Sequence, residues 1–124
     1  MKILLLSLYF LAATYGSTDR FANTNWVSKA ANRYTDSFNF RENKYVVHYC
    51  ALSERTFHGC YTISKDTLII KERNNIYGDR TEYYRTKFLL KNQVLYPYSH
   101  EEMIAHRWEK SKIQLAKSYT FRKI

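Results

Sequence analysis

Apolar and polar residues alternate with a period of two along much of the chain, most clearly over residues 57–74. A two-residue turn at Lys65-Asp66 would place Ile63 opposite Leu68, and one step further Tyr61 opposite Ile70. The polar residues between them then fall on the other face, as in an antiparallel sheet with one wet side. This segment therefore predicts a β-hairpin, and its apolar face is the best core candidate in the sequence.

The alternation resumes over residues 82–90, after turn-forming residues at Asn74-Asn75 and Gly78-Asp79. The core or lining candidates on this strand are Tyr84, Phe88 and Leu90. A corner at residues 91–92 and a return over 93–96 follow, and Pro97 is expected to end that strand because it has no N–H to donate. The pattern indicates a mainly β fold built as an antiparallel meander.

A short helix is predicted near the C-terminus, over residues 99–110. Ser99 and Glu102 have the spacing of a capping box, in which each side chain bonds the backbone of the other. Ile104 and Trp108 are four residues apart and would share the buried face of this helix.

The first sixteen residues have the pattern of a secretory signal peptide. Lys2 gives a basic start, residues 3–13 are almost wholly apolar, and small residues follow up to Gly16. The apolar tract is too short for a membrane span, and the alternative is a buried N-terminal helix or strand. Residues 1–16 are thus expected to be removed, leaving 17–124 as a single secreted or periplasmic domain without a transmembrane segment.

The chain is basic, with a formal net charge of +9. A positive surface suits acidic partners, but the same charges also solvate the outer face of a β-domain, and no run of like charges occurs. Residues 83–87 interleave aromatic and basic side chains as single-strand binders do, yet this is also ordinary on an antiparallel strand. Because export removes the protein from cytoplasmic nucleic acid, a nucleic-acid partner is not expected.

Two cysteines lie in the expected exported domain, which makes a disulfide the default. A hairpin centred near Arg55 would bring Cys50 opposite Cys60. The alternative is a reactive thiol activated by His48 or His58, which are close in sequence.

Neither a metal centre nor an active site can be assembled from the sequence. Four histidines are present, but His100 and His106 would lie on different faces of the predicted helix, and zinc needs ligands that converge. No combination of nucleophile, base and orienting residue stands out, so neither a cofactor nor enzymatic activity is expected.

Several short segments together resemble the small lipocalin-like proteins exported by bacteria, in particular by Bacteroidetes. The residues that carry the resemblance are Asn25-Trp26, Phe38 to Phe40, Asn43 to Tyr45, Gly59 to Ile63, Asp66 to Ile70 and Trp108 to Lys112. True lipocalins have a glycine two residues before the first tryptophan, where this chain has Thr24, and their barrels usually need a longer chain. The resemblance therefore implies a small, shorter or partly open lipocalin-like β-barrel.

What the resemblance implies about function is a non-enzymatic binding role for a small apolar ligand. Twelve tyrosines and seven phenylalanines suit the lining of a pocket or an interface, although they also suit strands of a half-exposed sheet. The expected lining or core residues are Tyr61, Ile63, Leu68, Ile70, Tyr84, Phe88 and Leu90. The alternative is an interaction module, such as an inhibitor or immunity protein, that docks on an acidic protein partner.

Overall fold

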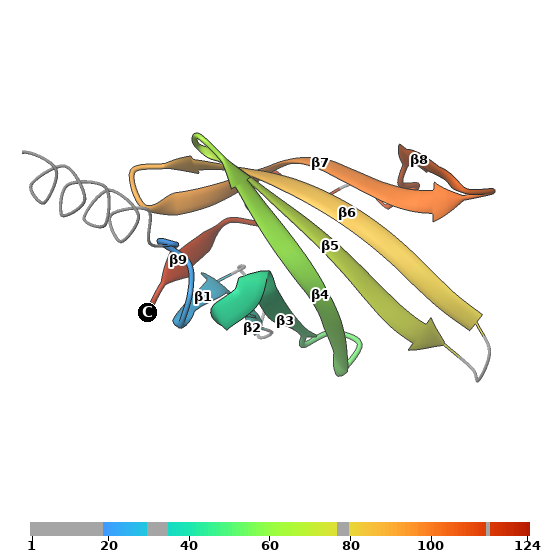
Figure 1. The fold of residues 1–124 in the computed structure, drawn as a ribbon, viewed down its shortest axis with the longest axis horizontal. Helices are drawn as coiled ribbons and strands as arrows, with labels where there is room; N and C mark the ends of the chain where they lie inside the picture. Colours follow the sequence, from blue (N-terminus) through green and yellow to red (C-terminus); the bar gives the residue numbers. More distant parts are fainter. Residues whose placement is uncertain (1–18, 30–34, 77–79, 114) are drawn as a thin grey trace, which may run out of the picture.

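A computed structural model describes residues 19–29, 35–76, 80–113 and 115–124, which form one antiparallel sheet of nine strands (Figure 1). The predicted signal peptide, residues 1–16, lies outside this described part. The strands are β1 (Thr24–Lys29), β2 (Thr35–Phe40), β3 (Tyr45–Cys50), β4 (Arg55–Ser64), β5 (Thr67–Ile76), β6 (Arg80–Lys91), β7 (Val94–Ile104), β8 (Arg107–Lys110) and β9 (Phe121–Lys123). A three-residue 3₁₀ turn, η1 (Glu42–Lys44), joins β2 to β3.

Eight of these strands close into a barrel. Each strand from β1 to β7 pairs with the next, and β9 lies between β7 and β1. The expectation of a partly open barrel is therefore wrong, because Phe121 and Arg122 pair with the start of β7 while Arg122 and Lys123 pair with β1. The remaining strand, β8, lies outside the ring and pairs only with the far half of β7.

The predicted helix near the C-terminus is also wrong, since residues 99–110 form the second half of β7 and all of β8. Ala105 and His106 have φ of 50° and 62°, and between them they make a tight turn that sets Ile104 opposite Arg107. Pairing across the sheet thus overrides the local capping signal. Among the described residues, η1 is the only helical segment.

Pro97 does not end its strand. The pairing of β6 with β7 shifts here, because Phe88 lies opposite Pro97 while Lys87 lies opposite Ser99. Tyr98 is the extra residue of a β-bulge, and a bulge is one of the few places where a strand tolerates a residue without an N–H.

No helix in the described ranges has the length and apolar character that a membrane crossing requires.

The hydrophobic core fills one end of the barrel, which we call the core end. The predicted register of the β4–β5 hairpin is confirmed, with Tyr61 opposite Ile70 and Ile63 opposite Leu68. The buried residues of the core end are Phe21, Trp26, Phe38, Phe40, Val46, Tyr61, Leu68, Ile70, Phe88, Leu95 and Phe121. The turns between β4 and β5 and between β6 and β7 lie at this end, as does η1.

The segment before β1 covers the core end. Phe21 packs its ring 5.0 Å from that of Phe40 and 5.3 Å from that of Trp26 (centroid distances). Asp19 accepts hydrogen bonds from the hydroxyl of Tyr61 and, at 2.9 Å, from the ammonium of Lys44. The opposite end of the barrel, where β3 turns into β4 and β7 turns into β8, therefore holds what space the lumen has left.

Candidate functional site

A cavity of about 280 Å³ lies in the lumen at the end opposite the core, and we call it the lumen cavity. Its walls come from every strand between β2 and β7 and from the segment that follows β8. Its apolar and aromatic lining consists of Phe38, Phe57, Tyr84, Phe88, Ile113, Leu115 and Tyr119. Its polar lining consists of Asp36, His48, Cys50, Glu72, Thr86 and His100.

The polar lining arises because inward-facing positions change character along each strand. On β5, Ile70 belongs to the core and Glu72, two residues on, lines the cavity. On β3 the corresponding pair is Val46 and His48. Since side chains two residues apart point to the same face, the alternation that builds the core continues into the cavity with polar residues.

His48 is the most constrained polar side chain of the cavity. Its ring lies between those of Phe38 and Phe57, with centroid distances of 4.4 and 5.4 Å. Its Nδ1 is 2.7 Å from Oε2 of Glu72, whose side chain is only 6% exposed. Its Nε2, at the other edge of the ring, is buried and has no hydrogen-bond partner.

The charge of Glu72 controls the protonation of His48. Burial alone would lower the pKa of His48, but the charge of Glu72, the hydrogen bond to it and the charge of Asp36 outweigh burial. The net result is a pKa above the ordinary value of 6.5. Below pH 6.5 the folded protein therefore favours an imidazolium at this position.

The pKa of His100 is shifted in the opposite direction. Burial lowers its pKa, helped by the charge of His48, and these effects exceed the opposing charges of Glu72 and Glu102. Its Nδ1 is 2.8 Å from the hydroxyl oxygen of Thr86, and its ring stacks on that of Tyr84 at 5.6 Å with an angle of 6°. The cavity thus shifts the pKa values of its two imidazoles in opposite directions.

The segment after β8 forms one side of the cavity. The backbone N–H of Ser111 donates to the carbonyl of His100, which starts this segment beside β7. Further along, the hydroxyl of Tyr119 donates to Asp36, and burial together with this hydrogen bond raises the pKa of Tyr119. The second carboxylate oxygen of Asp36 accepts the N–H of Ala51 at 2.8 Å. Asp36 therefore ties three separate parts of the chain together at the cavity.

The arrangement combines apolar surface with a small number of polar groups. No group of three His, Cys, Asp or Glu side chains within the described ranges is placed to hold a metal ion. The cavity offers aromatic surface, a buried ion pair and one hydrogen-bonding atom without a partner, which are the features of a binding pocket.

The residues predicted to line a pocket or core are divided between the two ends. Tyr61, Leu68 and Ile70 are fully buried in the core, and Ile63 and Leu90 pack against it. Of the predicted set, only Tyr84 and Phe88 reach the lumen cavity.

Sequence reasoning missed the polar lining. His48 was considered as a metal ligand or a base for a thiol, and Glu72 and Asp36 were not singled out. The signal was present, however, because Glu72 follows Ile70 by two residues on a strand whose inner face was already recognised. A charged residue at an inward position of a predicted barrel strand is the feature that would have found the site.

The predicted disulfide between Cys50 and Cys60 is wrong, and both cysteines are free. The turn over residues 51–54 sets Cys50 opposite Arg55, whereas Cys60 lies opposite Tyr45. Five residues along a strand span roughly 16 Å, more than twice what a disulfide bridges. Cys50 lines the lumen cavity and Cys60 is exposed on the outer surface, so the barrel wall separates them.

The two thiols are expected to differ in reactivity. In the folded protein a maleimide should modify Cys60 quickly and Cys50 slowly, because access to the lumen is restricted. Intact mass spectrometry after timed labelling measures both rates, and Cys60→Ser should remove the fast phase while Cys50→Ser keeps it. A protein that takes up no label until it is reduced would contradict the assignment.

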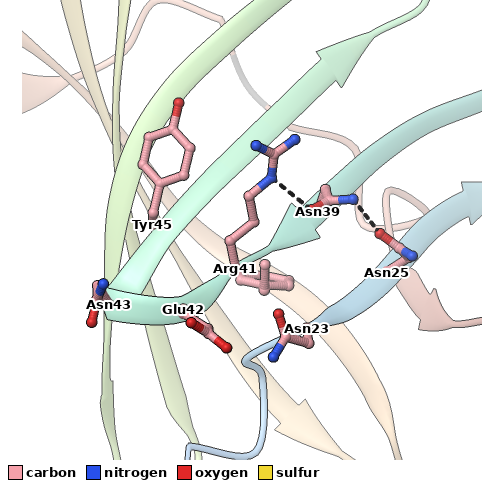
Figure 2. A pocket seen from close by; sticks show the side chains of 8 residues that line it. Asn23, Asn25, Asn39, Arg41, Glu42, Asn43 and Tyr45 are labelled. Carbon is pink, nitrogen blue, oxygen red and sulfur yellow. Dashed lines mark hydrogen bonds between the residues drawn. The ribbon is translucent and has the colours of Figure 1, made fainter.

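Two further hollows lie on the outer surface. One, of about 650 Å³, lies beside η1, and Figure 2 shows hydrogen bonds that link Asn25, Asn39 and Arg41. Asn39 donates to Asn25 at 2.6 Å and accepts from Arg41 at 3.2 Å. Asn25 and Arg41 are exposed, and Asn39 is half-buried. The other, of about 420 Å³, lies over β4 and β5 and includes Lys71, Arg73 and Trp108. Neither contains a buried polar atom without a partner, in contrast to the lumen cavity.

Comparisons with protein-family models, with curated proteins and with solved structures find no match to this chain.

Proposed function

We propose that the protein is a non-enzymatic binding protein that holds a small, largely apolar ligand in the lumen cavity. The observation that carries this proposal is the cavity itself, in which aromatic side chains surround a buried histidine whose Nε2 has no partner. An unsatisfied buried polar atom costs about 1–3 kcal/mol, and a ligand that bonds to it recovers this cost.

The size of the cavity limits the ligand. Its volume of about 280 Å³ is nearly twice that of an engineered cavity of about 150 Å³ that binds benzene. A molecule with one substituted ring, or a short branched chain, has the matching size. Larger lipids exceed this volume.

The closed eight-stranded barrel supports the same proposal, since a barrel of this size can hold one small ligand in its lumen. The proposal includes export, because residues 1–16 have the pattern of a signal peptide.

Native mass spectrometry of the full chain, expressed in a host that exports it, tests this function. We expect a low-mass adduct on the wild-type protein and none on Cys50→Trp, because the indole fills the cavity. Cys60→Trp is the matched control, since it places the same ring on the outer surface and should keep the adduct. Circular dichroism of both variants confirms that they are folded.

A wild-type protein without any adduct, under conditions in which added single-ring compounds also fail to bind, would contradict the proposal. So would an adduct that Cys50→Trp retains in full, because the ligand would then lie outside the lumen cavity.

A further inference from the structure

We infer that the ligand of the lumen cavity is a small ring compound with a neutral hydrogen-bond acceptor, such as a carbonyl, which receives the N–H at Nε2 of His48. This inference rests on the proposed function and adds the chemical class of the ligand. Four observations carry it: the unpaired atom, its state as a donor, the occupied carboxylates and the aromatic walls.

The unpaired atom is the first observation. Among the described residues, Nε2 of His48 and Oγ of Ser28 are the buried side-chain polar atoms without a partner. Ser28 does not line the lumen cavity, whereas His48 does. Buried polar groups are nearly always satisfied in folded proteins, so an orphan that faces a cavity indicates what the cavity receives.

The orphan atom is a donor. A carboxylate oxygen of Glu72 lies 2.7 Å from Nδ1 of His48 and can only accept, so Nδ1 carries a hydrogen. The buried charge of Glu72 also favours the doubly protonated ring, as the raised pKa of His48 indicates. Below pH 6.5, Nε2 then carries the second hydrogen and requires an acceptor from the ligand.

The carboxylates of the cavity are already occupied. Glu72 accepts from His48, and the two oxygens of Asp36 accept from Tyr119 and from the N–H of Ala51. A ligand that brings a donor or a cation would have to compete for these oxygens. A ligand that brings a full negative charge would approach Glu72 and Asp36 with only His48 to offset them. A neutral acceptor avoids both costs.

The walls of the cavity favour a ring. His48 is fixed between Phe38 and Phe57, and Tyr84 stacks on His100, so the side chains around Nε2 are planar and held in place. Flat aromatic surfaces pack well against a planar ligand in offset or edge-on arrangements.

The test compares two probes of nearly equal shape, acetophenone and isopropylbenzene, in which a carbonyl replaces a CH–CH₃ group. Their dissociation constants for the full chain are measured by NMR titration at pH 6, where His48 is charged. We expect acetophenone to bind about tenfold more tightly or better, which is what one hydrogen bond to a charged buried donor contributes. The ¹⁵N resonance of Nε2 of His48 should shift with acetophenone and stay in place with isopropylbenzene.

Two variants locate the preference. His48→Phe keeps an aromatic ring between Phe38 and Phe57 and should bind both probes equally. His100→Phe removes the other imidazole of the cavity and should keep the preference for acetophenone. If His48→Phe does not fold, the ¹⁵N shift in the wild-type protein still decides the question.

Each remaining outcome overturns a defined claim. Equal affinity for both probes, without a shift at Nε2, overturns the inference and leaves the proposed function intact. If benzoate or benzylamine binds more tightly than acetophenone, the ligand is an anion or a cation and not a neutral acceptor. This outcome also overturns the inference. Binding of none of these compounds overturns the proposed function together with the inference.

Discussion

Replacement of Gly59 by alanine is expected to lower the free energy of unfolding by about 3 kcal/mol or more. A Cβ at this position would lie 2.0 Å from the carbonyl oxygen of Lys71 and 3.0 Å from Cα of Glu72. Both atoms belong to the backbone of β5, which pairs with β4 on either side of Gly59. The strand can move away only by breaking these pairs, so the clash is not relieved by a side-chain rotation.

Urea unfolding followed by tryptophan fluorescence measures this loss. Thr62→Ala on the same strand is the matched control, because the side chain of Thr62 is exposed and its removal should change the stability by less than about 0.5 kcal/mol. A Gly59→Ala protein as stable as this control would show that β4 and β5 lie further apart here than the structure has them.

Replacement of Glu72 by glutamine is expected to cost about 2–3 kcal/mol of stability at pH 5 and about 1 kcal/mol at pH 8. In the wild-type protein the raised pKa of His48 contributes stability that is fully present below 6.5 and is lost as the pH rises through the folded pKa. Without the charge of Glu72, burial dominates and the pKa of His48 falls below 6.5. On acidification the protonation of His48 then lowers the stability of the variant, whereas in the wild-type protein it raises the stability.

The measurement is a pair of urea titrations for each protein at the two pH values. Glu101→Gln is the control, because it also removes an ion pair. In this pair Nε of Arg85 lies 2.9 Å from Oε1 of Glu101, and the pair lies nearer the surface than that of His48 and Glu72. The hydrogen bond from Arg85 lowers the pKa of Glu101, so its contribution changes only below pH 4.5 and should be constant between pH 5 and 8. A loss in Glu72→Gln that does not depend on pH would contradict the assigned charge of His48.

The meander could be predicted because its strongest signals are local. The alternation around Tyr61 and Ile70 defines both the strands and their register, since one face must be buried. Closure of the barrel could not be predicted from such local signals. It depends on the three residues of β9, which are placed by pairing with strands distant in sequence, and three residues carry no periodicity of their own.

The wrong predictions of a helix over residues 99–110 and of a disulfide between Cys50 and Cys60 have a common physical cause. Each depends on a turn that the sequence does not clearly indicate. The β3–β4 and β7–β8 hairpins close through residues with positive φ that are neither glycine, asparagine nor aspartate, among them Glu54 and Ala105. Such turns have no clear composition signal. Without a recognised turn at Ala105, the capping box at Ser99 predicted a helix, and without the turn over 51–54 the register of Cys50 was displaced.

The candidate site was partly visible in the sequence. Tyr84 and Phe88 follow from the apolar alternation. His48 was considered only as a metal ligand or as a base for a thiol, and Glu72 and Asp36 were not singled out, because polar side chains are expected to face water. Their inward positions become clear only once the barrel is closed, since only then does the inner face of each strand enclose a common space.

The position of β8 outside the ring divides the molecule into parts of unequal local stability. At the core end the strands pack on a cluster of buried aromatic rings. The amide hydrogens that are hydrogen-bonded between these strands should therefore exchange with solvent only through global unfolding. β8 is paired with β7 over four residues, whereas residues 111–113 and 115–119 contact the ring through, among others, the N–H of Ser111 and the hydroxyl of Tyr119, and Ile113 is 66% exposed. We expect this part of the chain to open locally while all eight strands of the ring stay paired. For the ligand proposed above, we then expect the residence time in the lumen to depend on this local opening and not on global unfolding.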